Sequence, residues 1–228
     1  MKHAGKASRA ALRLLYSSLF FVVSLLLFGM LARLLSQFMG VASAGLVALW
    51  LVFAVFCLYF FRDPAPRVPK AGEAVVAPAH GKVDVIDEVD EPLFLKGRCR
   101  RVSIFLSVFD VHVQNAPVAG RVALSQYRRG KFLNAMRTDT AEHNENLFVG
   151  FESSEQPGER VAIRLIAGLI ARRIRPWFQL GDVVARGERL GLIQFGSRVE
   201  IYLPLTMRVA VTLGSRVRGG ETVIATRT

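Results

Sequence analysis

An apolar run over residues 14–61 is the feature that most constrains how this chain folds. It contains a single charged residue, Arg33. One helical crossing of a bilayer takes about 20 residues, so the run is too long for one span and long enough for two. We therefore expect a two-helix transmembrane or membrane-embedded hairpin, with helices at about 14–35 and 41–61 and a turn at 36–40.

Basic residues on both sides of this run predict its orientation. They cluster before the first helix and after the second, at Lys2, Lys6, Arg9, Arg13, Arg62, Arg67 and Lys70. The positive-inside rule then puts both ends of the hairpin, and the rest of the chain, in the cytoplasm. A signal peptide is the alternative, but no small-residue cleavage site follows the first apolar segment, and a second apolar segment does. We expect Tyr59, Phe60 and Phe61 to lie at the membrane–water interface as aromatic anchors. The side chain of Arg33 is expected to reach the headgroups, and the alternative is that Arg33 is a functional charge within the membrane.

The formal net charge of +12 indicates a polyanionic partner. Beside a membrane hairpin the simplest such partner is an anionic membrane, and we expect the inner cell membrane, with the folded domain on its cytoplasmic face. Nucleic acid is disfavoured because the basic residues are scattered and no nucleic-acid-binding motif is present. The two cysteines, Cys57 and Cys99, form no disulfide framework, which agrees with a reducing cytosol.

The pattern after the hairpin predicts a mainly β domain. Residues 1–13 are a basic tail, residues 62–72 are a linker that contains three prolines, and the domain occupies residues 73–228. Segments rich in Val, Ile and Phe and bounded by turn residues occur at 74–77, 82–86, 101–107, 121–127, 147–151 and 161–166. A short helix around residues 168–174 is the one helical feature that we expect in this domain.

Two glycine-rich segments of the domain repeat each other. "LGDVVARGERLGLI" at 180–193 and "LGSRVRGGETVIA" at 213–225 share the pattern L-G-x-x-V-x-x-G-E, 33 residues apart. Their glycines allow the positive φ angles of tight turns, from which a strand returns to the core. We expect a pseudosymmetric β domain of the barrel-sandwich type, the alternative being a coincidence of two glycine-rich turns. No lysine has the flanks of a lipoyl or biotin acceptor, so a swinging-arm carrier is disfavoured.

The histidines give no metal site. Beyond the basic tail, His80, His112 and His143 are too scattered for zinc-ligand spacing, and the cysteines do not complete a set. Serine-hydrolase motifs of the G-x-S-x-G and S-x-x-K types are also missing. His112 ends an apolar strand that would hold a site residue rigidly, and a structural histidine with a satisfied hydrogen bond is the alternative.

Gly196 and Ser197 interrupt two apolar segments in "LGLIQFGSRVEIYLP". A serine hydroxyl can attack the carbonyl of the preceding residue and convert the amide into an ester. Elimination from that ester leaves dehydroalanine, which hydrolyses to an N-terminal pyruvoyl group. A preceding glycine minimises steric hindrance at the attacked carbonyl. On these residues alone, a Gly-Ser bulge within a strand is the simpler interpretation.

Several motifs in one order resemble the short-form phosphatidylserine decarboxylases. "GLIQFGSRVEIYLP" resembles the processing site of that family, "YFFRDPAPR" its segment after the membrane hairpin and "FDVHVQNAPVAGRV" its histidine strand. "KFLNA" and "IAGLIARRI" match in the same order, and the resemblance covers roughly residues 59–225.

The resemblance implies a proenzyme that cuts itself between Gly196 and Ser197. The products would be a large chain of residues 1–196 and a small chain of residues 197–228, whose Ser197 becomes a pyruvoyl group. That group would be the only cofactor, with no metal. It would form a Schiff base with the amine of phosphatidylserine, or of a related serine-headgroup lipid, and release CO2 to give phosphatidylethanolamine. His112 matches the family's histidine that assists decarboxylation or protonation of the product.

The chain departs from the family at one position. His80, in "APAHG", stands where the family usually has an aspartate associated with self-processing, in "SPADG". An imidazole there can still act as a base towards Ser197, or the chain is a processing-defective pseudoenzyme of the same fold. A non-enzymatic membrane adaptor with a barrel-sandwich domain is the other alternative.

Further polar residues are weaker candidates for lipid binding. Asn115 stands where long-form members have a second histidine. Arg172, Arg173 and Arg198 could hold the lipid phosphate or bind the leaflet. The two chains of the proenzyme are expected to stay together, and a homo-oligomer stays open.

Overall fold

The computed structural model describes residues 6–131, 143–168, 173–193 and 197–227, and the side chains from residue 15 onwards within those ranges. It divides into two units, Met1–Cys57 and Leu58–Thr228. The first unit is helical, and the second carries all of the strands described below.

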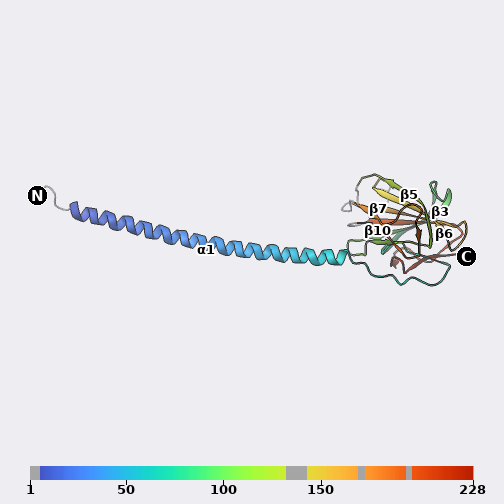
Figure 1. Cartoon of the computed structure of the whole chain (residues 1–228), viewed down its shortest axis with the longest axis horizontal. Coiled ribbons are helices and arrows are strands. Elements are labelled where there is room, and N and C mark those ends of the chain that lie inside the picture. Colours follow the sequence, from blue (N-terminus) through green and yellow to red (C-terminus); the bar gives the residue numbers. More distant parts are fainter. Residues whose placement is uncertain (1–5, 132–142, 169–172, 194–196, 228) are drawn as a thin grey trace. The chain divides into compact units, whose positions relative to one another are not determined.

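The apolar run forms one continuous helix, α1 (Lys6–Phe60) (Figure 1). The predicted break at residues 36–40 is therefore not confirmed. Those residues include no proline, and Ser43 Oγ donates to the Gly40 carbonyl at 2.9 Å, so nothing in this stretch interrupts the helical hydrogen bonds. The part Leu15–Phe60 is long and apolar enough to cross a membrane, and its apolar side chains are exposed. Exposed apolar surface of this extent is suited to membrane association.

The second unit is built of antiparallel strands, which confirms the prediction of a mainly β domain (Figure 1). The strands of its large sheet, in spatial order, are β13 (Arg216–Val217), β2 (Gly81–Glu91), β3 (Gly97–Leu106), β11 (Ser197–Pro204), β7 (Arg160–Ala167), β6 (Asn146–Ser153), β5 (Gly120–Arg128) and β9 (Val183–Val184). Two three-stranded sheets make up the rest of the described strands. One contains β1 (Ala74–Val76), β14 (Val223–Thr226) and β12 (Arg208–Val209), and the other contains β4 (Val113–Asn115), β10 (Arg189–Ile193) and β8 (Ile174–Pro176). The six β segments expected from the sequence correspond to β1, β2, β3, β5, β6 and β7. Most of the expected short helix falls at residues 169–172, outside the described residues, and Ile174 begins β8.

The predicted 33-residue repeat is confirmed by the backbone. Gly181 and Gly214 have φ angles of 96° and 87°, and Gly187 and Gly220 have φ angles of 78° and 73°. In each copy a two-residue strand pairs with an edge of the large sheet, and the next strand becomes the centre of a small sheet. The spatial order of the strands is accordingly the same from either end, with β13, β2, β3 and β11 mirrored by β9, β5, β6 and β7.

A second repeat, which we did not predict, supplies the rest of this symmetry. "APAHGKV" at 77–83 and "APVAGRV" at 116–122 lead into β2 and β5. The backbones around them exchange equivalent hydrogen bonds, from Val76 N to Pro117 O at 2.9 Å and from Asn115 N to Pro78 O at 2.8 Å. The domain is thus two similar halves related by a pseudo-twofold axis.

The core lies between the large sheet and the two small ones. Alternate side chains of the central strands enter it, among them Ile104, Ile163 and Ile201, each with no exposed surface. A smaller cluster around Phe148 and Tyr202 covers the opposite face of the large sheet. Because β11 is a central strand between β3 and β7, any residue on it is held firmly from both sides.

Candidate active site

Ser197 is the first residue of β11 and is completely buried. It lies opposite Leu106 of β3 and Ala167 of β7, and no register shift interrupts either ladder. Its Oγ has no hydrogen-bond partner within the described part of the chain. A buried hydroxyl without a partner costs about 1–3 kcal/mol, so folding stability does not explain a serine at this position. Gly196 lies outside the described residues.

His112 is fixed between the end of β3 and the start of β4, with no exposed surface. Its Nδ1 lies 2.9 Å from the Asp110 carbonyl oxygen, which accepts the Nδ1 proton and leaves the lone pair on Nε2. The His112 carbonyl accepts a hydrogen bond of 3.3 Å from the amide of Ile193, the last residue of β10, four positions before Ser197. Phe60 packs against the imidazole with 4.2 Å between ring centroids. Burial lowers the pKa of His112 to about 4, so the ring is neutral at pH 7.

His80 lies half-buried just before β2. Burial lowers its pKa, an effect that the nearby carboxylates of Glu221 and Asp110 oppose. Lys82, two positions further on, pairs with Phe105 of β3, and Leu106 of β3 pairs with Ser197. Two strand spacings therefore separate the start of β2 from Ser197, a distance of about 10 Å. A neutral imidazole at this position can accept a proton.

Asn115 and His80 meet at Gly219. Asn115 is buried and donates through Nδ2 to the Gly187 carbonyl at 2.9 Å. A Cβ added to Gly219 would lie 2.6 Å from Asn115 Oδ1 and 3.1 Å from His80 Cδ2, so only glycine fits between them. Sequence reasoning missed Gly219. The signal was the second repeat copy, which has two adjacent glycines where the first has Arg186 and Gly187.

The loop from Ser107 to Asp110 ties these positions together, and sequence reasoning missed it as well. Asp110 Oδ2 accepts hydrogen bonds from the Ser107 amide at 2.9 Å and the Ser107 hydroxyl at 2.7 Å. The next carbonyl back, that of Phe109, accepts a hydrogen bond of 2.6 Å from Arg62. The loop thus starts beside the partner of Ser197 and ends at the carbonyl that orients His112.

The arginines expected to bind lipid have different surroundings. Arg198 is completely buried, and its guanidinium binds both carboxylate oxygens of Asp84, at 2.8 and 2.6 Å, and the Ser103 hydroxyl at 2.6 Å. A lipid phosphate would have to displace Asp84 from this bidentate pair. Arg173 is exposed, and Arg172 lies outside the described residues.

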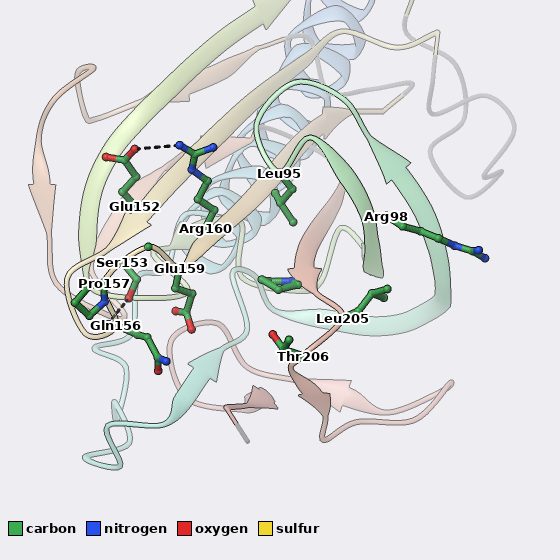
Figure 2. A pocket seen from close by; sticks show the side chains of 12 residues that line it. Leu95, Arg98, Glu152, Ser153, Gln156, Pro157, Glu159, Arg160, Leu205 and Thr206 are labelled. Atoms are coloured by element: carbon green, nitrogen blue, oxygen red, sulfur yellow. Dashed lines mark hydrogen bonds and ion pairs between the residues drawn. The ribbon is translucent and has the colours of Figure 1, made fainter.

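Two cavities differ in their relation to these residues. One of about 370 Å³ is lined by His80 and Asp110 together with Arg62, Arg216 and Arg218. Another, of about 920 Å³, is lined by Arg98, Glu152, Arg160 and Leu205 among others and includes none of the predicted site residues (Figure 2). Within the described ranges no group of three or more His, Cys, Asp or Glu residues could hold a metal ion.

Comparison with known proteins assigns the family. A model of the family described as phosphatidylserine decarboxylase matches residues 53–225. A phosphatidylserine decarboxylase proenzyme of Symbiobacterium thermophilum is 44% identical over 204 residues, which cover 90% of this chain and 91% of the relative. Proenzymes of Desulfotalea psychrophila and Carboxydothermus hydrogenoformans are also 44% identical, each over 78% of this chain and over 83% and 85% of the relatives. This chain therefore belongs to the phosphatidylserine decarboxylase family.

Proposed function

We propose that the chain is a self-processing phosphatidylserine decarboxylase that converts phosphatidylserine into phosphatidylethanolamine and CO2. One observation carries this proposal beyond family membership. The Ser197 hydroxyl is buried without a hydrogen-bond partner in the described structure, at the first residue of a central strand. A hydroxyl that adds nothing to stability is explained if it is consumed in a reaction.

Ser197 is the nucleophile of self-cleavage. Its Oγ bonds to the Gly196 carbonyl carbon while the peptide C–N bond breaks, so that an ester replaces the amide. Elimination then releases Gly196 as a carboxylate and leaves dehydroalanine, and hydrolysis of that residue releases ammonia and gives the pyruvoyl group. His80 is the base that takes the Oγ proton. Because about 10 Å separate the start of β2 from Ser197, transfer of the proton to the imidazole requires a bridging water.

The residues at Ser197 fit a pyruvoyl group. The group supplies the electron sink for breaking the bond to the substrate carboxylate. The β3 and β7 strands on either side of Ser197 hold its backbone in place. His112, neutral and oriented by the Asp110 carbonyl, holds a proton acceptor at Nε2 for transfers to and from the substrate.

The membrane helix brings this site to a lipid substrate. The apolar part of α1 has 46 residues, roughly 70 Å at 1.5 Å per residue, against a hydrocarbon core of about 30 Å. We infer that in a bilayer the segment turns at residues 36–40 and crosses twice, with the β domain on the cytoplasmic face of the inner membrane. Two passes match the length, and the basic residues on both flanks match the orientation.

Intact-mass analysis of the purified full chain tests the function. We expect two polypeptides, of residues 1–196 and 197–228, the smaller with a pyruvoyl start, and release of CO2 from phosphatidylserine. His80, in place of the family's usual aspartate, motivates the alternative of a processing-defective relative. Wild-type protein that remains a single full-length chain and releases no CO2 would establish that alternative.

A further inference from the structure

We propose that the cavity beside His80 binds the phosphodiester of the lipid headgroup, with Arg62, Arg216 and Arg218 as its cationic ligands. This inference rests on the proposed function, because it assigns the part of the substrate that does not react. It replaces the expectation that Arg172, Arg173 or Arg198 holds the phosphate.

The composition of the cavity favours an anion. Its volume is about 370 Å³, and its charged lining comprises three arginines and one carboxylate, that of Asp110. His80 adds no charge at neutral pH, because burial lowers its pKa. The cavity is therefore net positive. Arginine is the side chain best suited to a phosphate, since its planar guanidinium donates two parallel hydrogen bonds.

Arg62 contributes a cation that is fixed in advance. Its Nη1 donates to the Tyr59 carbonyl at 2.7 Å and its Nη2 to the Phe109 carbonyl at 2.6 Å, and its guanidinium carbon lies 3.9 Å from the centre of the Tyr59 ring. Both acceptors are uncharged, so the positive charge of Arg62 is not neutralised by them. Arg62 follows the last residue of α1 by two positions, which puts it at the headgroup level of a membrane that contains this helix.

Arg216 and Arg218 contribute cations that can move onto a ligand. Arg216 lies 3.6 Å from Asp110 and Arg218 lies 3.7 Å from Glu221, and the two arginine side chains are 79% and 76% exposed. Exposed ion pairs at such distances are weak because water screens the charges, so a phosphate can replace them at little cost. Arg198 differs in both respects, because its bidentate pair with Asp84 is short and the arginine is buried.

The headgroup is long enough to cover part of the distance from the cavity to Ser197. Gly81 lines the cavity, and its strand lies about 10 Å from Ser197. The amine of a phosphoserine headgroup is four bonds from the phosphorus, which spans about 5 Å. The headgroup covers about half of the separation between the cavity strand and Ser197, so a phosphate held on the Ser197 side of the cavity directs the amine and carboxylate towards Ser197, while the acyl chains leave towards the membrane.

Binding can be measured separately from processing in the full-length Ser197→Ala chain in detergent, which stays uncut. Glycerophosphoserine, which is the headgroup without acyl chains, would be titrated calorimetrically into this protein and into the same protein carrying Arg216→Gln and Arg218→Gln. We expect the two substitutions together to weaken binding at least tenfold. Arg98→Gln is the matched control, because Arg98 is also an exposed arginine, 67% accessible and 3.6 Å from Glu88, and lies on the other cavity. It should leave the affinity unchanged.

Further arms identify the ligand. Inorganic phosphate should bind more weakly than glycerophosphoserine, and free serine should show no dependence on the arginines. Equal affinity of the double variant and its parent would overturn the proposal, as would inorganic phosphate binding as tightly as glycerophosphoserine, which would make this a site for free phosphate. In processed enzyme made from a chain that keeps Ser197, the same double substitution should raise KM for phosphatidylserine. A wild-type chain that is never cut would refute the proposed function, but it would not affect the binding measured in the Ser197→Ala chain.

Discussion

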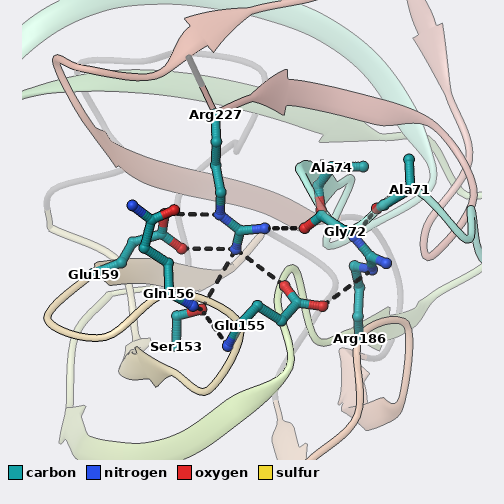
Figure 3. A network of polar contacts seen from close by, with 9 residues as sticks. All are labelled: Ala71, Gly72, Ala74, Ser153, Glu155, Gln156, Glu159, Arg186 and Arg227. Atoms are coloured by element: carbon teal, nitrogen blue, oxygen red, sulfur yellow. Dashed lines mark hydrogen bonds and ion pairs between the residues drawn. The ribbon is translucent and has the colours of Figure 1, made fainter.

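Arg227 donates two hydrogen bonds to the carboxylate of Glu159, from Nε at 2.8 Å and from Nη2 at 2.7 Å (Figure 3). The same guanidinium lies 3.0 Å from Glu155 and donates to the Gly72 carbonyl. Arg227 belongs to the predicted small chain, and its partners belong to the predicted large chain. After a cut before Ser197 these contacts join two separate polypeptides.

We predict that Arg227→Ala weakens the association of the two chains. The side chains of Arg227 and Glu159 are 8% and 9% exposed, and removing one partner of a buried pair costs about 3–5 kcal/mol. Urea unfolding of the Ser197→Ala chain measures this cost, and size-exclusion chromatography of processed enzyme detects released small chain. Arg121→Ala removes an exposed ion pair with Glu152 and should cost less than about 1 kcal/mol. Equal effects of the two substitutions would contradict the prediction that the contacts of Arg227 hold the two chains together.

We predict that Ser197→Ala abolishes the cut without destabilising the fold. Removing a buried hydroxyl that has no partner should leave the free energy of unfolding unchanged or raise it by about 1 kcal/mol. Ser103→Ala is the contrasting control, because the Ser103 hydroxyl accepts a hydrogen bond from Arg198, and its loss should cost about 1–3 kcal/mol. Mass spectrometry and thermal unfolding provide the two readouts. Cleavage that persists at this bond in the alanine variant would rule out Ser197 as the nucleophile.

We predict that His80→Ala slows self-cleavage by about 10²-fold or more, the usual contribution of a general base. Since burial lowers the pKa of His80, the wild-type rate should be constant at neutral pH and decline only below pH 6.5, as the imidazole becomes protonated. The rate of appearance of the small chain between pH 4.5 and 8 measures this. His143→Ala, at an exposed histidine, is the control. If His80→Asp cut faster than wild type, the chain would instead be impaired by its histidine.

We predict that Gly219→Ala disturbs the site more than the fold. The added methyl group would lie 2.6 Å from Asn115 Oδ1 and 3.1 Å from His80 Cδ2, so Asn115 must shift from its hydrogen bond with the Gly187 carbonyl and His80 must yield as well. Overpacking of this kind costs about 1–3 kcal/mol, and displacement of His80 should also slow self-cleavage. Gly97→Ala has nothing within 4 Å of its new methyl group and serves as the control. If Gly219→Ala were cut at the wild-type rate, the position of His80 would not matter for self-cleavage, and His80 would not be its base.

The sequence predicted the β class and the 33-residue repeat because both depend on local patterns. The alternation of apolar and polar residues that marks a strand, and the glycines that mark a turn, can each be recognised within a few neighbouring residues. We did not predict the shorter repeat at 77–83 and 116–122, which completes the pseudosymmetry. The predicted turn in the apolar run was not confirmed, because residues 36–40 carry no helix-breaking proline and a bilayer, rather than the chain, would dictate a turn there.

The pseudosymmetry also explains what sequence reasoning could not find. Leu106 ends β3 opposite Ser197, and Ser153 ends β6 with its amide donating to the Glu159 carbonyl at 3.0 Å. The Arg227 network thus occupies the end of the domain equivalent to the end that carries Ser197. At the end of β6 this position carries the ion pairs of Arg227, and at the end of β3 it carries the buried hydroxyl of Ser197. The arginines of the small cavity were missed for a related reason, since residues 62, 216 and 218 meet only through the fold.

We predict that His112 makes the stability of the uncut Ser197→Ala chain depend on pH. Burial lowers the pKa of His112 from 6.5 to about 4, against the opposing influences of the Asp110 carbonyl and carboxylate, while Arg62 and His80 act with burial. Between these two pH values the unfolded chain binds more protons than the folded chain. The contribution of His112 to the free energy of unfolding is therefore fully present above pH 6.5. It falls by up to about 3 kcal/mol as the pH drops towards 4.

Urea unfolding of this chain at intervals from pH 4.5 to 7.5 measures the dependence, and His112→Gln provides the comparison. Glutamine keeps a hydrogen-bond donor for the Asp110 carbonyl but does not titrate. Its stability curve should therefore be flatter than that of the parent over this range, because the contribution of His112 is removed. Parallel curves for the two proteins would mean that His112 takes up its proton as readily in the folded chain as in the unfolded one, and a neutral imidazole could then not be its working form at pH 7.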